Sequence, residues 1–216
     1  MSLLAKHLNR FNAISVREIS GKNICEVLGF ETPIVVDPTM LLPKDEYINL
    51  LSSSDKEKSF AYLYILNIKS PTDISWAKID AYLKKRNLKS VVTNASGGFP
   101  AKEWFPDVDY QYSTIPQWIS NIKNSEIFLT TSFHGVVFAI LMHANFVFVP
   151  IKTKGANSRA ESLLNSLNLS FRIWDCKKDL DKLFEQEIDW NKIDNNLNQM
   201  RQFSVSWLLS NISKKA

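Results

Sequence analysis

The stretch from Ile127 to Pro150 constrains the fold more than any other part of the sequence. It holds two short apolar runs, IFLT and FVFVP, on either side of a longer apolar run that begins at Phe133. Short apolar runs are typical of strands covered on both faces, and the longer run has the length of a buried helix. The stretch therefore predicts a strand, a tight turn, a buried helix and a second, parallel strand.

The same alternation extends over the rest of the chain. Further strands are expected at residues 13–16, 34–36, 60–66 and 89–93, and further helices at 20–28, 44–51, 73–86 and 115–123. Residues 94–110, with two glycines and two prolines, are expected to form a long loop. A long amphipathic helix is expected at 189–213, packing back on the domain. The pattern predicts an α/β fold, a Rossmann-like parallel sheet with helices on both faces, in a single domain over residues 1–216.

Composition limits the classes of function. The chain has 216 residues, 45% of them hydrophobic, so it can bury a sizeable core. Its net charge is +4, and 26 basic residues are spread among 22 acidic ones, which gives little support for nucleic-acid binding. Two distant cysteines without a CxxC pattern argue against a zinc site and a disulfide framework, and fit a reducing cytoplasm. No apolar run reaches the roughly 20 residues of a membrane-spanning helix.

His134 is the first candidate for chemistry. It lies in the motif TSFHG, where the predicted strand is followed by the helix, and ligands of parallel sheets bind at that edge. If Thr131 or Ser132 caps the helix, the backbone N–H groups of residues 133–135 can bind a phosphate or carboxylate at the positive end of the dipole. The alternative is that His134 hydrogen-bonds to the preceding loop and that Gly135 serves helix packing.

Basic residues follow the second strand of the stretch. Lys152 lies in a Lys-x-Lys-Gly loop, and Arg159 lies in the first turn of a helix expected to begin near Ser158. Ser158 and Glu161 have the spacing of a capping box. A positive charge in the first turn opposes the helix dipole, which pairing of Arg159 with an anion would explain. A solvated surface arginine is the alternative.

Two charged residues near the start of the chain are further candidates. Arg17 follows the run AISV, so it would lie at the carboxyl end of a strand of the same sheet and could reach the ligand of His134. An ordinary surface ion pair is the alternative. Asp37, before Pro38, is expected to stop a strand and start a turn rather than to take part in catalysis.

Four segments occur in an order that resembles a known family. They are AISVRE, VVDPTMLL, TSFHGVVFAIL and NSRAESLL, and together they resemble the C-terminal half of the polysaccharide pyruvyl transferases. The resemblance implies one half of a two-domain fold like that of B-type glycosyltransferases. It also implies transfer of a pyruvyl group from phosphoenolpyruvate to a sugar hydroxyl pair, with formation of a cyclic ketal and release of phosphate. Such reactions belong to the synthesis of bacterial exopolysaccharide and capsule.

The resemblance assigns roles to individual residues. His134 matches the family's histidine at the helix start, in contact with phosphoenolpyruvate and expected to be catalytic, and Arg17 and Arg159 match arginines that contact the donor. Several members carry an arginine where this chain has Ser132. With the argument from the residues, the expected substrate-binding set is Arg17, Ser132, Phe133, Gly135, Lys152 and Arg159.

Cofactor, partners and location follow from the same resemblance. No cluster of metal-ligating residues is visible in the sequence, so we expect no metal and no cofactor besides the donor substrate phosphoenolpyruvate. The expected acceptor is a sugar or lipid-linked oligosaccharide, and an N-terminal domain outside this chain is expected to supply much of its site. The expected location is the cytoplasm or the inner face of the membrane.

Two other functions remain open from the sequence. The chain could be the nucleotide-sugar-binding domain of a B-type glycosyltransferase, which binds its donor in the same crevice with the same helix dipole. It could also be a binding module without catalytic activity.

Overall fold

The computed structural model describes residues 3–51, 59–93, 102–153 and 155–212. They divide into two compact units, where the sequence predicts one domain. The smaller unit comprises Met1–Leu42 with Asp189–Ala216, and the larger comprises Pro43–Ile188.

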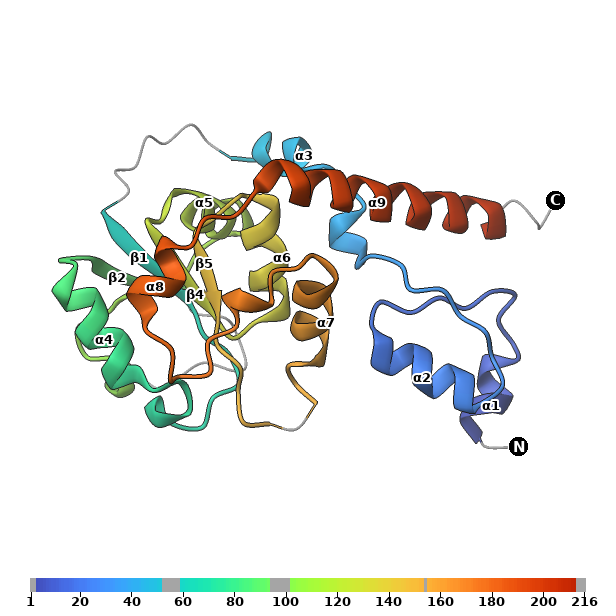
Figure 1. Cartoon of the computed structure of the whole chain (residues 1–216), viewed down its shortest axis with the longest axis horizontal. Coiled ribbons are helices and arrows are strands. Elements are labelled where there is room, and N and C mark those ends of the chain that lie inside the picture. Colours follow the sequence, from blue (N-terminus) through green and yellow to red (C-terminus); the bar gives the residue numbers. More distant parts are fainter. Residues whose placement is uncertain (1–2, 52–58, 94–101, 154, 213–216) are drawn as a thin grey trace. The chain divides into compact units, whose positions relative to one another are not determined.

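The larger unit is built around a five-stranded parallel sheet (Figure 1). Its strands are β1 (Phe60–Tyr64), β2 (Lys89–Thr93), β3 (Asp109–Gln111), β4 (Ile127–Thr130) and β5 (Phe146–Phe148). They lie in the order β3-β2-β1-β4-β5, and each neighbouring pair is parallel. The predicted Rossmann-like parallel sheet is confirmed.

Helices cover both faces of this sheet. The α-helices of the larger unit are α3 (Lys44–Ile48), α4 (Trp76–Lys85), α5 (Ile115–Asn124), α6 (Phe133–Leu141), α7 (Ser158–Ser166) and α8 (Leu180–Glu185). The described residues of this unit also form the short 3₁₀ helices η2 (Pro71–Ile74), η3 (Lys102–Trp104) and η4 (Ser170–Arg172). Figure 1 shows the sheet enclosed between these helices.

Side chains alternate between the two faces along each strand, as the pleat requires. On one face Leu63, Leu129 and Val147 pack in a buried core with apolar residues of α4 and α8. On the other face the Tyr64 ring contacts Trp118 of α5, with 5.1 Å between ring centroids. Trp118 in turn contacts Phe138 of α6, with 5.0 Å between ring centroids. Consequently α4 and α8 cover one face of the sheet, and α5 and α6 cover the other.

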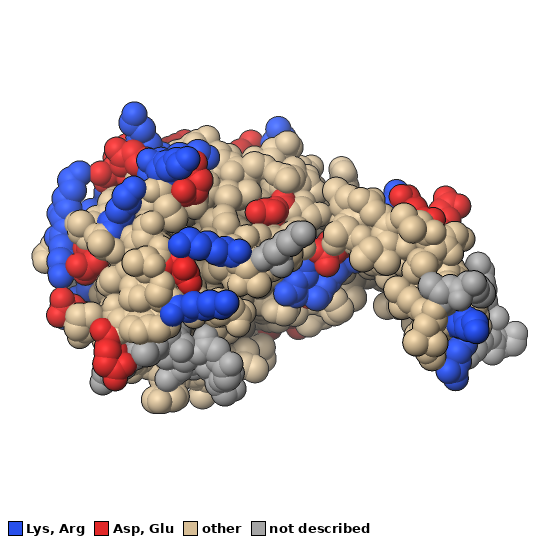
Figure 2. Space-filling view, turned by 90° about the horizontal axis from the view of Figure 1, so that it is seen from below, with Lys and Arg blue, Asp and Glu red and all other residues tan. Residues whose placement is uncertain are grey.

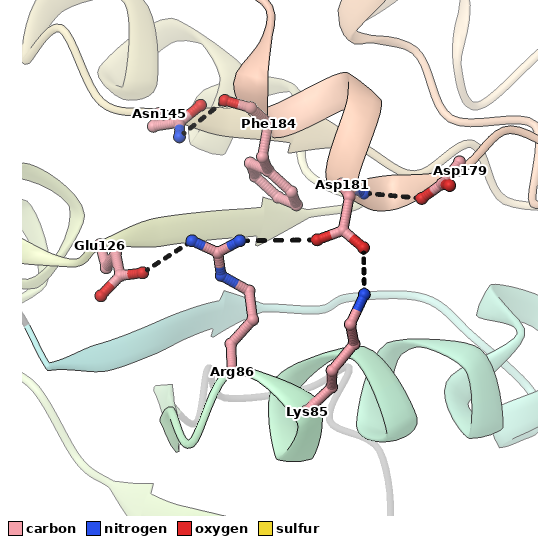
Figure 3. Close-up of polar contacts among 7 residues, drawn as sticks. All are labelled: Lys85, Arg86, Glu126, Asn145, Asp179, Asp181 and Phe184. Carbon is pink, nitrogen blue, oxygen red and sulfur yellow. Dashed lines mark hydrogen bonds and ion pairs between the residues drawn. The ribbon is translucent and has the colours of Figure 1, made fainter.

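Ion pairs join α8 to the end of α4 at the amino-terminal edge of the sheet (Figure 3). Arg86, directly after α4, lies 3.4 Å from a Glu126 carboxylate oxygen and 3.5 Å from one of Asp181 on α8. Lys85 lies 2.8 Å from the other Asp181 oxygen. These side chains are partly exposed, so each pair contributes little to stability.

Arg172 stabilises the same region through buried hydrogen bonds. Its side chain is buried and donates to Asn145 Oδ1 (2.9 Å) and to the carbonyl oxygens of Phe146 (3.3 Å) and Gln186. Burial lowers the pKa of Arg172 to about 10. One guanidinium therefore holds η4, the start of β5 and the end of α8 together.

The smaller unit contains α1 (Leu3–Leu8), α2 (Ile19–Val27), the 3₁₀ helix η1 (Pro38–Met40) and α9 (Trp190–Ile212). The apolar spacing of residues 189–213 corresponds to α9. Ser204 Oγ of α9 accepts a hydrogen bond from the Val36 N–H (3.0 Å), and Arg201 Nε donates to the Met40 carbonyl (2.8 Å). Thus α9 packs on the segment that contains η1.

Some predicted elements are wrong. Residues 13–16 and 34–36 form no strands; Val16 and Ile34 make one isolated parallel bridge in the smaller unit. Proline lacks the N–H that a ladder needs, and Pro33 and Pro38 flank the second run. Strand β3 begins within the predicted loop 94–110 and ends just after it, and residues 94–101 of that loop fall outside the described residues.

No membrane span is found in the described parts, and the face shown in Figure 2 carries charges of both signs. None of their helices is long and apolar enough to cross a membrane. On the face shown in Figure 2, basic side chains lie among acidic ones over the larger unit. That mixed pattern differs from the basic stripe typical of nucleic-acid-binding domains.

We predict that Arg172→Met lowers the free energy of unfolding by roughly 2–4 kcal/mol, because it removes the charged donor that joins Asn145, the buried Phe146 carbonyl and Gln186. The exposed Arg86→Met is the matched control and should cost at most about 1 kcal/mol. Urea denaturation followed by circular dichroism measures both. Equal losses in the two variants would contradict the role assigned to Arg172.

Candidate functional site

The site lies where β1 and β4 end side by side. The helix that follows β1, α4, covers one face of the sheet, whereas the helix that follows β4, α6, covers the other. Adjacent strands whose connections leave in opposite directions open a crevice at their carboxyl ends, and ligands of such sheets bind there. His134, in the first turn of α6, lies at this edge.

Two threonine hydroxyls tie the ends of these strands together. Thr131 Oγ1 accepts from the Leu66 N–H (2.7 Å) and donates to the Leu66 carbonyl (2.9 Å). Thr130 Oγ1 donates to the Tyr64 carbonyl (2.8 Å) and accepts from the Ser132 N–H (3.0 Å). The turn before α6 is therefore fixed to the end of β1 by side chains as well as by the sheet.

Of the two N-cap candidates expected from the sequence, Thr131 and Ser132, it is Ser132 that caps α6. Its backbone is extended, and its Oγ accepts a hydrogen bond from the Gly135 N–H (3.3 Å). The cap engages both the Ser132 hydroxyl and the Gly135 N–H, and the substrate-binding roles expected for these two residues stay predictions.

Gly135 is required for packing. A Cβ built on it would lie 2.3 Å from Thr130 Oγ1 and 2.9 Å from Thr130 Cβ. No real Cβ approaches a neighbour so closely, so only glycine lets α6 begin directly against the end of β4. Gly135 therefore makes room for Thr130, the last residue of β4.

Three predicted site residues meet at the start of α6. The rings of Phe133 and His134 contact edge to face, with 5.2 Å between centroids. Arg159, in the first turn of α7, places its guanidinium carbon 5.1 Å from the Phe133 ring centroid, a cation–π contact. Phe133 is buried, His134 is exposed and Arg159 is half-buried. The structure therefore assembles a basic, partly exposed group at the crevice.

The start of α7 differs in detail from the prediction. Asn157, not Ser158, is the N-cap, and Ser158 Oγ donates to the Gly155 carbonyl (3.1 Å). The Asn157 side chain accepts from the Ile151 N–H (3.0 Å) and donates to the Ile151 carbonyl (2.8 Å). Sequence reasoning missed this residue, although asparagine is a common N-cap and would have been the signal.

Lys152 is engaged with a carboxylate. Its Nζ lies 3.4 Å from Asp73 Oδ1, in the 3₁₀ helix that follows β1. Hydrogen bonds from the Lys69 N–H and from Lys152 lower the pKa of Asp73 against the opposing effect of desolvation. Lys152 thus links the loops after β5 and β1, and its expected contact with substrate stays a prediction.

Arg17 lies in the smaller unit. It does not end a strand of the five-stranded sheet, so the argument that placed it there is wrong. Its guanidinium pairs with the buried carboxylate of Asp37, and it lines a largely apolar cavity of about 310 Å³ with Trp207 and Leu208 of α9. The expected contact of Arg17 with the donor stays a prediction.

Asp37 has the structural role predicted for it. It caps η1 by accepting from the Thr39 N–H (3.1 Å) and hydroxyl (2.7 Å). Burial alone would raise the pKa of Asp37, but these hydrogen bonds and Arg17 lower it below its ordinary value of 3.8. Among the described residues, no three His, Cys, Asp or Glu side chains are grouped so that they could hold a metal ion.

Comparison with known proteins assigns the family. The sequence profile described as "Polysaccharide pyruvyl transferase" matches residues 1–153. The chain belongs to the polysaccharide pyruvyl transferase family. The match includes the segments around Arg17 and His134 and ends before Arg159.

A solved structure resembles this chain over part of its length. "Crystal Structure Analysis of the Glycotransferase of kitacinnamycin" aligns with a TM-score of 0.46 at 12% identity, over 71% of this chain. The chain spans 42% of the length of that structure. A search of curated proteins gave no match.

We predict that Gly135→Ala destabilises the protein by about 1–3 kcal/mol, since the new methyl group collides with Thr130. Gly21→Ala in α2 is the milder comparison: a Cβ there would meet Val16 Cβ at 3.3 Å, so Val16 needs to shift by only a few tenths of an ångström, and alanine favours the helix. It should cost less than Gly135→Ala. Thermal unfolding measures both variants. An unchanged midpoint for Gly135→Ala would refute the close contact.

We predict that the Asp37 carboxylate stabilises the protein at neutral pH and loses this effect in acid. A carboxyl whose folded pKa is below its unfolded value contributes fully above the unfolded value and loses the contribution as pH falls through the folded pKa. The difference in unfolding free energy between the parent and Asp37→Asn should therefore be full at pH 7 and shrink below about pH 4. A difference that is constant from pH 7 to pH 3, by denaturant titration, would contradict this assignment.

Proposed function

We propose that this chain carries the donor site of a pyruvyl transferase that uses phosphoenolpyruvate and a polysaccharide or its lipid-linked precursor. Membership of the family supports pyruvyl transfer in general. The observation that supports a donor site here is the group of Arg159, Phe133 and His134 at the carboxyl edge of the sheet. Phosphoenolpyruvate carries a carboxylate and a phosphate, the groups that an arginine fork binds in bidentate fashion.

The proposed reaction is balanced without a cofactor. Each oxygen of a sugar hydroxyl pair forms a bond to C2 of phosphoenolpyruvate, and the bond from C2 to the bridging phosphate oxygen breaks. One hydroxyl proton ends on the methylene carbon, which becomes a methyl group, and the other leaves with phosphate. The product is a cyclic ketal that keeps the carboxylate.

Arg159 is suited to hold the donor. A cation–π contact fixes the guanidinium over Phe133 without using its N–H groups as donors, so they can point to oxyanion groups of the substrate. Arginine keeps its charge at any working pH. We assign Arg159 to the phosphate or the carboxylate of phosphoenolpyruvate.

His134 is suited to move a proton. The His134 side chain is exposed, and a dianion bound beside it would favour the protonated form of the imidazole. In the proposal, protonated His134 acts as general acid, giving a proton to the methylene carbon or to the departing phosphate while a sugar hydroxyl adds to C2.

The remaining parts of the site follow from the resemblance. Arg17 is proposed as a further donor contact, and an N-terminal domain outside this chain is proposed to supply the acceptor site. The reaction is placed in the cytoplasm or at the inner face of the membrane.

We predict that Arg159→Ala weakens phosphoenolpyruvate binding by about 10-fold or more, because a hydrogen-bonded charge pair contributes about 1.5–3 kcal/mol. Isothermal titration measures this, with inorganic phosphate as a second ligand. Arg86→Ala, at the opposite edge of the sheet, is the matched control and should bind as the parent does.

Two outcomes would oppose the donor assignment. One is equal affinity in the parent and Arg159→Ala. The other is a parent that does not bind phosphoenolpyruvate but is stabilised by a uridine or guanosine diphospho-sugar, which would favour a glycosyltransferase.

We predict that His134→Gln lowers turnover by about 10²–10⁴-fold, the usual contribution of a general acid, and changes phosphoenolpyruvate affinity much less. Release of phosphate from phosphoenolpyruvate in the presence of sugar acceptors measures turnover. Normal turnover in His134→Gln would exclude the proton-transfer role, and a loss confined to affinity would make His134 a binding residue.

A further inference from the structure

Asn157 holds the loop between β5 and α7 closed. Its side-chain amide pairs with both backbone groups of Ile151, at 3.0 Å from the Ile151 N–H and 2.8 Å to the Ile151 carbonyl. An asparagine amide has a donor and an acceptor side by side, so it can satisfy both groups of one residue. Two further contacts tighten the loop, from the Ala156 N–H to the Thr153 carbonyl (3.2 Å) and from Ser158 Oγ to the Gly155 carbonyl (3.1 Å).

This use of Asn157 is unusual for its position. It is the N-cap of α7, where an asparagine side chain ordinarily accepts from the helix N–H groups, yet it makes no such hydrogen bond. The amide bonds to the residue that follows β5 instead. The end of β5 and the first turn of α7 are therefore joined through one side chain.

Arg159 lies in that first turn, two residues after Asn157. Its guanidinium rests on Phe133, whose ring contacts His134. A long arginine side chain loses conformational entropy when a bound anion holds it in place. If the backbone of Arg159 is already fixed, less entropy is lost on binding and the affinity for the anion is higher. Movement of the first turn of α7 would shift Arg159 relative to α6.

We propose that Asn157 is a positioning residue for the donor site: by closing the loop onto Ile151 it fixes Arg159 over Phe133, ready for the oxyanion of the substrate. This inference rests on the proposed function. It assigns Asn157 an effect on donor affinity through Arg159, without contact with the substrate.

A double-mutant cycle tests the proposal, using Asn157→Ala, Arg159→Ala and the pair. Loss of the two hydrogen bonds should weaken phosphoenolpyruvate binding by about 5-fold or more in Asn157→Ala. In the Arg159→Ala background the same change should have almost no further effect, because the residue it positions is gone. Asn157→Asp, which keeps an acceptor but loses the donor, should be weakened as well.

Asn124→Ala is the matched control. Asn124 ends α5 and donates to Ser120 Oγ (3.1 Å), one turn away on the same helix. This variant should bind phosphoenolpyruvate as the parent does.

Hydrogen exchange provides a readout that does not need the substrate. Amides of residues 151–153 and 155–160 should exchange faster in Asn157→Ala than in the parent, while those of β1 and β4 keep their protection, which also shows that the variant is folded. Parent-like exchange of these residues would overturn the inference, as would parent-like affinity or additive losses in the cycle. Absence of phosphoenolpyruvate binding to the parent would overturn the proposed function instead, and the exchange rates would still decide whether Asn157 closes the loop.

Discussion

The contact between Thr130 and Gly135 is the constraint on which the site depends. The Thr130 hydroxyl binds the Tyr64 carbonyl at the end of β1, and its side chain fills the space that a Cβ at residue 135 would need. One threonine thereby joins β1, β4 and α6. Because α6 begins directly against the strand end, its first residues, Phe133 and His134, come to the edge where β1 and β4 send the chain to opposite faces.

Four arginines of this chain differ in the groups that their guanidinium contacts, and this difference distinguishes structural arginines from a candidate binding arginine. Arg86 lies between two carboxylates, Arg172 is buried against carbonyl oxygens, and Arg17 is paired with Asp37. These partners neutralise or occupy the guanidinium. Arg159 rests on an aromatic ring, which fixes its position and keeps its charge available to an anion. The arrangement suits a donor with two anionic groups.

The parts of the fold that the sequence predicted are those with a strong local signal. The apolar runs of β1, β4 and β5 and the long apolar helix α6 need burial on both sides, whatever surrounds them. By contrast, β3 has only three residues, Asp109–Gln111, and is defined by its pairing with β2. Residues 13–16 have strand-like side chains, yet they find only one bridge. Propensity for strands is realised only where a partner strand is present.

In the candidate site too, residues with a local sequence signal could be predicted, whereas contacts between distant segments could not. His134 and Ser132 were recognisable because a capping residue and a helix start leave a local pattern. The closure of Asn157 onto Ile151 and the contact of Arg159 with Phe133 depend on side chains that meet across a loop or between helices, so spacing along the chain could not reveal them.

The sequence by itself determined an α/β architecture, because the alternation of short apolar runs with helical patterns leaves few other ways to bury them. It also narrowed the cap of α6 to Thr131 or Ser132. Tertiary structure decided the order β3-β2-β1-β4-β5, and so placed the ends of β1 and β4 side by side. It decided that Arg159 joins Phe133 and His134 and that Arg17 is paired with Asp37 in the other unit. Local patterns fix what a segment becomes, but which side chains meet depends on packing between segments distant in the chain.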